Sequence, residues 1–534
     1  MLSFFNDPSE IVDHMLEGVA LGAPVRLLRD GHGMRLVVRQ DWAKDAVAIV
    51  SGGGAGHEPA HAGFVGAGML TAAVSGELFA SPSVDAVLTA IREVTGPAGC
   101  LLVVKNYTGD RLNFGLAAER ARSEGFAVAT VLVADDVALP GAAQPRGLAG
   151  TVLVHKLAGH LAQRGESLER IHARVQTFAD SMRTLGFALS PCHVPGRPAE
   201  SRGPELGMGI HNEPGARPIA PDGAGHAMDL VLEPLLADRP ATQPLVVLLN
   251  DLGGCSPQEL LVLTRELCLR MGPARIARLV RPARALSSLD MHGFSVTVAP
   301  ADDDLLAALD APVDLGAWPG TVRPRPVNAV TLAPRTEDEP VTPPDAKVVA
   351  LVRAVCTVLV GAQVELDALD AKVGDGDAGS TFAGGARAVL ERLAQDRLPT
   401  GDHAALFRGL GTLLARAMGG SSGVLCSILF TAMGTALASG ASLADALGAG
   451  LERMQHYGGA HVGDRTMLDA LVPAAAALPR GIAAAAAAAR SGADGTATMT
   501  HAGAGRSSYV PAAALQGTVD PGAEAVARAF AVLV

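Results

Sequence analysis

Short β-branched runs alternate with helix-length segments in the first part of the chain. Continuous apolar runs of this length are typical of parallel strands that helices cover on both faces. The pattern therefore predicts an α/β domain with mostly parallel strands, and the Pro- and Gly-rich stretch between residues 133 and 245 indicates two lobes. The predicted strands are residues 47–50, 101–104, 128–133, 245–249, 276–280 and 295–298.

The pattern changes after residue 320. Residues 321–345 combine prolines with mixed charges, which sustain neither a helix nor a central strand, so we predict a linker there. From residue 346 onward, Ala, Leu and Val recur at helical spacing in about eight segments separated by Gly-rich loops. We therefore predict a multi-domain chain, with an α/β domain at residues 1–320 and an all-helical bundle or barrel at residues 346–534.

Composition narrows the classes of protein. Of 534 residues, 49% are hydrophobic and 18% charged, which excludes disorder as the main state. The net charge of −11 and the small number of aromatic residues (2 Trp, 3 Tyr and 13 Phe) argue against a nucleic-acid partner. Six cysteines without CxxC spacing and an acidic amino terminus without a signal peptide indicate reduced thiols and a cytoplasmic location.

One stretch is long enough for a membrane helix. No charged residue lies between Arg416 and Asp445. Because glycines at 419, 420 and 423 interrupt this stretch, we predict a buried helix of a soluble protein and no membrane partner.

Three segments of the α/β part carry candidate chemistry. Residues 51–59 (SGGGAGHEP) follow a predicted strand and let backbone amides approach a ligand, although such a loop is more often only a tight turn. It fits neither Walker A nor GxGxxG. Asp110, in KNYTGD, lies at the carboxyl edge of the predicted sheet, where it is a base or a cap residue. His211, in ELGMGIHNEPG, is a nucleophile when neutral. Their occurrence in one α/β unit favours a shared site over three ordinary loops.

The helical part contributes an acidic loop. Asp370, Asp375 and Asp377 lie within eight residues, and their charges repel unless cations neutralise them, which suits Mg²⁺ with phosphate. The EF-hand pattern is missing, and a solvated acidic loop is the alternative. Residues 419–423 (GGSSG) open a helix with free amides, as a phosphate cradle or a flexible turn. Arg465 and Arg506, in two later loops, are nucleotide contacts or ion-pair partners.

These motifs, in this order and over nearly the whole chain, resemble the dihydroxyacetone kinase family in its single-chain, ATP-dependent type. The resemblance implies a homodimer that phosphorylates a small ketose or triose with ATP and two Mg²⁺ ions. It implies a covalent hemiaminal on His211, with His57 and Asp110 as its catalytic partners and Asp370, Asp375 and Asp377 as metal ligands. Gly53, Gly54 and Lys105 complete the substrate site. The implied nucleotide-binding residues are Gly379, Ser380, Thr381, Gly420, Ser421, Ser422, Gly423, Thr466, Met467 and Arg506.

Three positions depart from the family pattern without removing a chemical group. Ala55 replaces a common Ser, Asn212 a common Gly and Ala378 a common Thr. Ala55 and Asn212 lie beside the substrate motifs, so a four-carbon ketose such as erythrulose is an alternative substrate. Because an imidazole adds to a carbonyl but not to a polyol, we expect glycerol to be rejected.

Other functions remain open. A related phosphotransferase takes phosphate from a carrier protein, although its two domains are usually separate chains. A metal-dependent lyase that forms a cyclic nucleotide from a flavin dinucleotide would use the same helical domain. A non-catalytic carbonyl-binding regulator would have no use for the metal and phosphate loop. Turnover with ATP alone discriminates against the carrier-dependent phosphotransferase.

Overall fold

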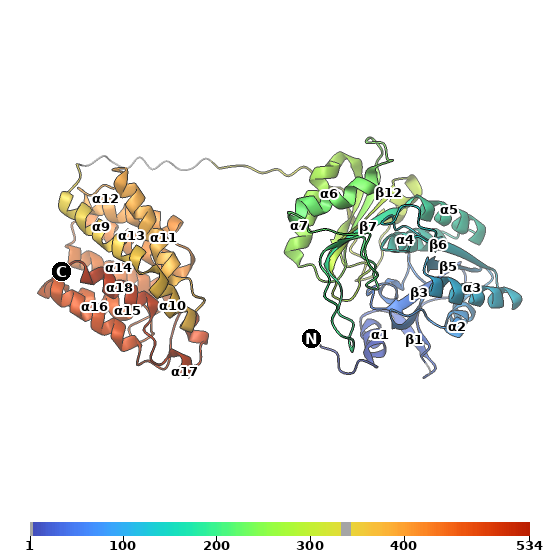
Figure 1. The fold of residues 1–534 in the computed structure, drawn as a ribbon, viewed down its shortest axis with the longest axis horizontal. Helices are drawn as coiled ribbons and strands as arrows, with labels where there is room; N and C mark the ends of the chain where they lie inside the picture. The colour runs from blue at the N-terminus through green and yellow to red at the C-terminus, as the bar shows by residue number, and fades with distance from the viewer. Residues whose placement is uncertain (1–3, 32, 333–342) are drawn as a thin grey trace. The chain divides into compact units, whose positions relative to one another are not determined.

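A computed structural model of the chain describes residues 4–31, 33–332 and 343–534 (Figure 1). The chain forms two compact units, Met1–Val330 and Thr331–Val534. The boundary falls inside the segment predicted as a linker, whose residues 333–342 lie outside the described residues.

The first unit contains a six-stranded sheet. Strands β3 and β5 are buried at every position, as the continuous apolar runs predict for strands covered on both faces. Strands β4, β3, β5 and β6 are parallel, whereas the β1–β2 hairpin adds to β4 in the antiparallel direction. The order is β1 (Val25–Arg29), β2 (Arg35–Arg39), β4 (Ala72–Leu78), β3 (Ala48–Ala55), β5 (Cys100–Lys105) and β6 (Val128–Val133).

A second sheet has seven strands, and the prediction of mostly parallel strands is wrong here. Only β10 and β11 are parallel; the other neighbours are antiparallel. An apolar run reports burial on both faces but not strand direction, which explains the error. The order is β13 (Thr321–Val322), β11 (Ile276–Ala283), β10 (Leu245–Asp251), β12 (His292–Pro300), β7 (Arg183–Ser190), β8 (Glu205–Leu206) and β9 (Arg217–Pro218). Strand β13 extends this sheet beyond residue 320.

Helices form layers around the two sheets (Figure 1). Helices α2 (Val84–Val94) and α3 (Thr108–Ser123) cover one face of the first sheet. Helices α4 (Gly150–Gln163) and α5 (Leu168–Ser181) lie between the sheets, because one core joins their apolar residues to strands of both; α1 (Ile11–Gly22) and α8 (Asp303–Asp310) also contribute. Helices α6 (Gly223–Leu236) and α7 (Pro257–Met271) cover the far face of the second sheet.

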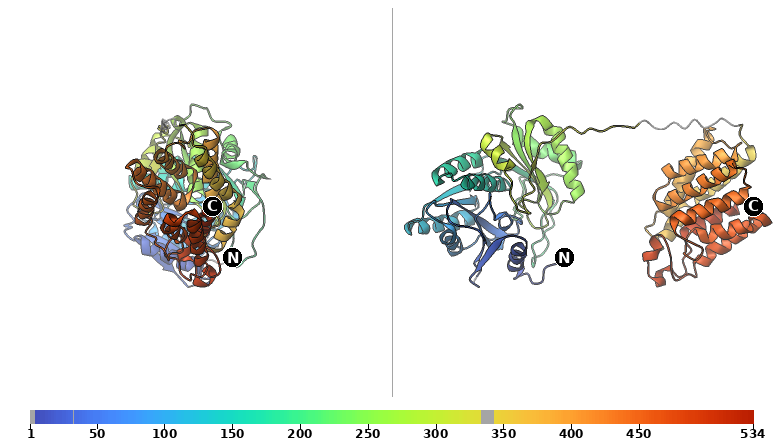
Figure 2. Two further views of the ribbon diagram at one scale, coloured as in Figure 1. Left: turned by 90° about the vertical axis from the view of Figure 1, so that its left-hand side faces the viewer. Right: turned by 180° about the vertical axis from the view of Figure 1, so that it is seen from behind.

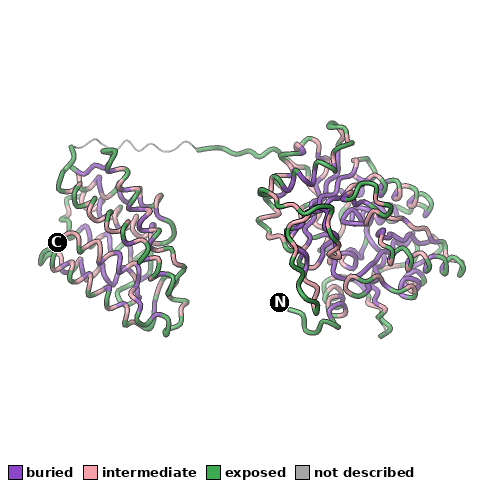
Figure 3. Tube along the Cα trace, in the orientation of Figure 1, coloured by how far each residue is buried: buried purple, intermediate pink, exposed green. Residues whose placement is uncertain are grey.

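This layering confirms the α/β fold but corrects one detail. The segment between residues 133 and 245, predicted as loops, contains α4, α5, β7 and α6. The buried tube segments in Figure 3 follow the strands of both sheets. The two lobes therefore share a hydrophobic layer.

The second unit is all-helical in its described residues, as predicted (Figure 2). Capping residues fix the ends of its helices, as α14 (Leu443–Gly458) shows. At its amino end, Ser442 accepts a hydrogen bond from the Asp445 amide, and at its carboxyl end Gly459 has a φ of 69°. The helices are α9 (Ala346–Gly361), α10 (Gln363–Val373), α11 (Ala378–Ala394), α12 (His403–Ala417), α13 (Gly420–Ala438), α14 (Leu443–Gly458), α15 (Leu468–Ala477), α16 (Ile482–Thr496), α17 (Ala512–Leu515) and α18 (Pro521–Ala531).

Helix α13 holds the long apolar stretch. It is long and apolar enough to span a membrane by length and composition, and only 22% of its apolar window is buried. The prediction of a buried helix is therefore wrong. Although α13 packs against α12 and α14, its side chains face two cavities. Leu425 and Ile428 line a cavity of about 880 Å³, whereas Leu429 and Phe430 line an apolar cavity of about 420 Å³.

Candidate active site

The carboxyl end of β3 brings backbone close to charged side chains. A Cβ atom at Gly53 would lie 3.0 Å from Lys105 Nζ and 3.7 Å from Asp110 Oδ2, so the missing side chain leaves room beside both groups. At Gly54 a Cβ atom would lie 2.6 Å from the Ala80 amide nitrogen, which requires glycine for packing. Gly53 therefore faces the charged groups, and Gly54 holds the loop against the next segment.

Two imidazole rings meet beyond this loop. The Nε2 atoms of His57 and His211 are 3.0 Å apart. The His57 Nδ1 atom is 2.8 Å from the carbonyl oxygen of Ser287, and His211 Nδ1 is 3.1 Å from a carboxylate oxygen of Glu213. Both acceptors require a proton on Nδ1, so the neutral form of each ring has its lone pair on Nε2. One proton shared between the two Nε2 atoms completes their hydrogen bond.

Electrostatics give the two histidines different roles. Burial, with the charge on Lys105, lowers the pKa of His57 well below its ordinary value. Burial acts to raise the pKa of Glu213, but hydrogen bonds from the side chain and amide of His211 hold it at about 2. Glu213 is therefore a carboxylate that stabilises positive charge on His211, whereas burial disfavours a lasting positive charge on His57. The arrangement favours His211 as the nucleophile.

Aromatic rings enclose the imidazole pair. The Phe79 ring stacks on His57 with centroids 5.2 Å apart. Tyr107 packs edge-on against His211 at 4.7 Å. His57 is fully buried, whereas the His211 side chain keeps an exposed fraction of 21%, so a small molecule can reach His211.

Asp110 lies in the first turn of α3. Its carboxylate accepts a 2.5 Å hydrogen bond from Ser81 Oγ, and Tyr107, not Asp110, occupies the N-cap position. The cap-residue interpretation is therefore wrong. Lys105 is buried nearby, and burial lowers its pKa, although the charges of Asp110, Glu213 and Glu58 oppose the shift. The structure thus brings together a carboxylate, an ammonium group and two imidazoles.

The helical unit contains the cavity of about 880 Å³. Residues from every Gly-rich loop predicted from the sequence line this cavity. These loops lie at the carboxyl ends of α10 and α14, at the amino end of α13 and before α17. Of the predicted site residues, those that line it are Asp370, Asp375, Asp377, Thr381, Gly420, Ser421, Ser422, Thr466, Met467 and Arg506.

Three predicted nucleotide-binding residues do not line this cavity. A Cβ atom at Gly379 would lie 2.0 Å from the Gln363 carbonyl oxygen, so this glycine packs α11 against α10. The Ser380 amide and hydroxyl both donate to Asp367. Gly423 is buried against the backbone of Met418. Their motifs indicated the correct loops but not which way each residue faces.

The three aspartates lie together. One oxygen each from Asp370, Asp375 and Asp377 lies within 4.8 Å of the other two. Asp370 Oδ2 accepts hydrogen bonds from the amides of residues 376, 377 and 378, at 3.0, 3.0 and 3.2 Å, which folds the loop around it. Asp375 is paired with Arg506. Clustered hard oxygen donors of this kind fit Mg²⁺.

Arg465 and Glu213 are missing from the set of site residues that the resemblance supplies. Arg465 lines the same cavity, is fully buried and donates to the Thr518 carbonyl oxygen at 2.7 Å. Its Nε and Nη1 atoms have no hydrogen-bond partner among the described residues, so they are available to an anion. Glu213 follows His211 by two residues, and this short spacing was the one feature of the sequence that could have indicated a contact between their side chains. Phe79 and Ser287 had no such signal, because they come from distant segments.

A nucleophilic imidazole with a carboxylate in one unit, and an acidic, amide-lined cavity in the other, define a two-part phosphotransferase. Comparisons with known proteins agree. Residues 17–317 match the Dak1 domain family and residues 372–534 match the DAK2 domain family. Dihydroxyacetone kinase of Citrobacter freundii is 47% identical, over 99% of this chain and 98% of that protein. Triokinase/FMN cyclase of Homo sapiens is 41% identical, over 98% and 97%.

A solved structure gives the same result. The C. freundii dihydroxyacetone kinase in complex with AMP-PNP and Mg²⁺ has a TM-score of 0.78 and 45% identity, and the match covers 100% of this chain and 99% of that one. The chain therefore belongs to the dihydroxyacetone kinase family.

Proposed function

We propose that the protein transfers the terminal phosphoryl group of ATP to a terminal hydroxyl of dihydroxyacetone or a similar short ketose or aldose. The observation that carries this proposal is the 3.0 Å contact between the His57 and His211 Nε2 atoms, with both Nδ1 atoms engaged elsewhere. It leaves one nucleophilic nitrogen beside one exchangeable proton, which is what carbonyl addition requires.

Groups of this site account for the electron pair, the proton and the charge of the addition step. The His211 Nε2 lone pair attacks the carbonyl carbon, and the carbonyl π electrons move to oxygen. The proton that the two Nε2 atoms shared lies on His57 Nε2 during this attack. The carbonyl oxygen then takes it, which gives a neutral hydroxyl and leaves His57 neutral. The positive charge left on the substituted His211 ring is balanced by Glu213, 3.1 Å from its Nδ1. A polyol has no electrophilic carbon, so it cannot be held in this way.

Asp110 is the base for the second step. Its carboxylate lies beside Gly53 with Lys105, where a substrate hydroxyl has room. It takes the proton of the hydroxyl as oxygen attacks phosphorus, and Ser81 keeps the carboxylate oriented. Lys105 adds positive charge next to the developing alkoxide.

The helical unit supplies the phosphoryl donor. Asp370, Asp375 and Asp377 would hold Mg²⁺, which, when bound, offsets the negative charge of the phosphate oxygens. Residues 420–422, in the first turn of α13, line the cavity, and the free backbone amides of a helix start suit phosphate oxygens. Arg465 and Arg506 add positive charge on the opposite loops.

Coupled ADP release tests the proposal with purified protein, ATP and Mg²⁺ over dihydroxyacetone, glyceraldehyde, erythrulose and glycerol. We expect turnover of the carbonyl compounds and none of glycerol. A crystal grown with dihydroxyacetone should show continuous density from His211 Nε2 to the central carbon. His211→Asn should lose ketone affinity and discriminate less against glycerol. A free ketone beside an unmodified ring would overturn the covalent step.

The same assay separates the other functions. Turnover only with a phosphorylated carrier protein would replace ATP as the donor, and preference for erythrulose would identify a four-carbon ketose as substrate. Because the human relative is a triokinase/FMN cyclase, flavin adenine dinucleotide is included to detect a cyclic product. We also propose the homodimer that the family resemblance implies, which light scattering of the purified protein tests.

A further inference from the structure

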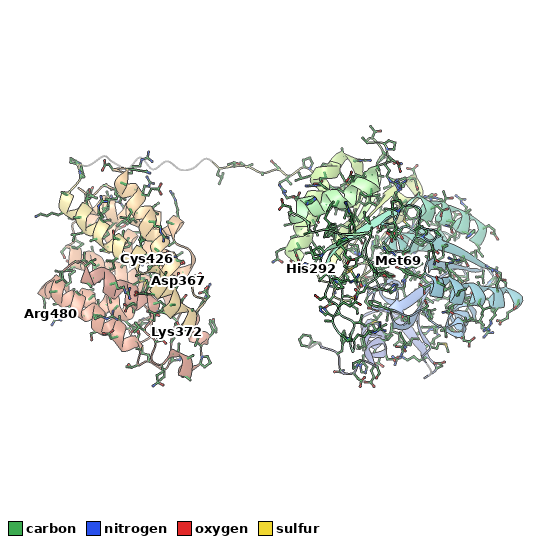
Figure 4. All side chains as sticks on the ribbon, in the orientation of Figure 1. Met69, His292, Asp367, Lys372, Cys426 and Arg480 are labelled. Atoms are coloured by element: carbon green, nitrogen blue, oxygen red, sulfur yellow. The ribbon has the colours of Figure 1, made fainter. Side chains whose placement is uncertain are left out.

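A second group of metal-ligand side chains lies in the α/β unit, outside the imidazole site. Cys255 follows β10, and Glu259 lies in the first turn of α7. His292, which is labelled in Figure 4, begins β12. One ligand atom from each residue lies within 4.8 Å of the other two, and all three residues are partly exposed. Sulfur, nitrogen and oxygen donors thus converge from three separate elements at a point that solvent can reach.

Backbone hydrogen bonds orient these donors. One Glu259 oxygen accepts the Ser256 amide at 2.7 Å, as part of a capping box, so its other oxygen faces His292 Nε2 at 2.8 Å. The Cys255 amide donates to Asp251 at 3.1 Å, and its Sγ lies 3.1 Å from the Gly293 carbonyl oxygen. The three donors are therefore held near one another by the fold itself.

The surrounding charges favour a cation. Asp251 is buried beside Cys255, and Glu259 adds a second carboxylate. Arg284 is the cation that faces this group, 3.3 Å from an Asp251 oxygen. A site with one thiolate, one imidazole and one carboxylate suits Zn²⁺, whereas Mg²⁺ prefers oxygen donors alone.

We propose that Cys255 Sγ, Glu259 Oε1 and His292 Nε2 bind one Zn²⁺ ion, with water as the fourth ligand. On binding, the Cys255 thiol releases its proton to solvent. The proton between His292 Nε2 and Glu259 transfers through solvent to His292 Nδ1, so that the ring stays neutral and its Nε2 lone pair binds Zn²⁺. The three ligand atoms lie within 4.8 Å of one another, which is close enough for all three to bind one tetrahedral ion after side-chain adjustment.

The location gives this ion a structural role. The chain between β11 and β12 carries Ser287, whose carbonyl oxygen binds His57, and Ser288, whose hydroxyl donates to the Ile210 carbonyl oxygen beside His211. His292 ends this segment, so a metal bond would fix it to the start of α7. The ion would thus stabilise the segment that positions both imidazoles.

Cobalt titration of the full-length, reduced, chelator-treated protein tests the proposal. A Co²⁺–thiolate bond gives a charge-transfer absorption that the aspartate cluster, which lacks sulfur, cannot produce. We expect this absorption at one Co²⁺ per chain and its loss in Cys255→Ser and His292→Ala. Glu259→Gln keeps the capping box and should weaken Co²⁺ binding about 10-fold or more. Cys268 lies on α7, the helix of Glu259, but outside the cluster. Cys268→Ser should therefore bind Co²⁺ as the unchanged protein does.

Zinc content provides a second measurement. Protein purified without an affinity metal should contain close to one zinc ion per chain, and Cys255→Ser should lose it while Cys268→Ser keeps it. Absence of the thiolate absorption in the unchanged protein, or equal zinc and cobalt binding by the two serine variants, would overturn the proposal. Because both measurements start from the unchanged protein, a poorly folded variant cannot decide the result.

Discussion

His57 and His211 differ in chemistry because their Nδ1 atoms face different acceptors. A backbone carbonyl oxygen faces His57, whereas the carboxylate of Glu213 faces His211. A carboxylate stabilises a charged imidazole and a carbonyl oxygen does so only weakly. In the proposed mechanism, Glu213 is therefore the positioning residue that makes His211, rather than His57, the nucleophile.

Replacing Glu213 with Gln tests this role. Without the negative charge, the substituted His211 ring is less stable, so we expect kcat/KM for dihydroxyacetone to fall about 10²-fold, with the KM for ATP unchanged. The pH dependence of kcat/KM should shift as well. Glu205→Gln is the control, because Glu205 binds the Gly215 amide in the same segment without contacting His211. Equal losses in both variants would make Glu213 a loop-folding residue only.

Asn212 has a positive φ of 62°, and its side-chain amide is bonded to both the amide and the carbonyl oxygen of Cys192, each at 3.0 Å. Asn212→Gly keeps the backbone conformation but loses both bonds, so unfolding should become easier by about 1–2 kcal/mol. Asn212→Ala loses the same bonds and also strains the backbone, so its loss should be larger. Urea unfolding measures both, and an Ala variant as stable as the Gly variant would contradict this account.

At the scale of elements, the sequence predicts buried strands better than partly polar ones. The apolar runs of β3, β5 and β10 are continuous, and the structure has strands there. Strand β7 contains Arg, Thr and Ser, so its sequence lacks a continuous apolar run and did not predict a strand. Its position in the sheet depends on its pairing with the distant strand β12. Distant pairings of this kind, like the one between Ser287 and His57, leave no local signal.

Two aspartates, one within α10 and one at the start of α11, allow a matched comparison. Asp377→Asn removes one negative charge from the proposed Mg²⁺ site, so phosphoryl transfer should become undetectable while dihydroxyacetone still binds. Asp367→Asn is the matched control, because Asp367 binds Ser380 and does not line the cavity, so this variant should keep activity within about 3-fold. ADP release measures turnover, and calorimetry with dihydroxyacetone measures binding. Near-normal turnover of Asp377→Asn at ordinary Mg²⁺ would remove this aspartate from the metal site.

At the scale of the whole molecule, each unit has its own hydrophobic core among the described residues. We therefore expect two thermal transitions. Because a ligand stabilises only the unit that binds it, dihydroxyacetone should raise one transition and Mg²⁺ with AMP-PNP the other, by roughly 5 °C at saturating concentrations. Asp377→Asn should abolish only the second shift. A single transition that both ligands raise equally would show that the units unfold together.

Acidification should move these two transitions in opposite directions. In the α/β unit, burial lowers the pKa of His57 and His61 well below their ordinary value and that of His155 to about 3. Unfolding lets each histidine bind a proton below about pH 6.5, so each costs up to about 1.4 kcal/mol of stability per pH unit as the pH falls. Burial raises the pKa of the Glu58 and Asp135 carboxyls in the same unit, and their protonation offsets part of this loss.

In the helical unit, burial raises the pKa of Asp520 to about 6, so protonation below pH 6 relieves a buried charge and stabilises the fold. Calorimetry at pH 7.5 and 5.5 should therefore show the first transition falling and the second rising. Asp520→Asn keeps the helix cap and should remove the rise, because an amide does not titrate in this range. His155→Gln should reduce the fall. If both transitions move downward together in the unchanged protein, the buried histidines and Asp520 do not control how the two units respond to acid.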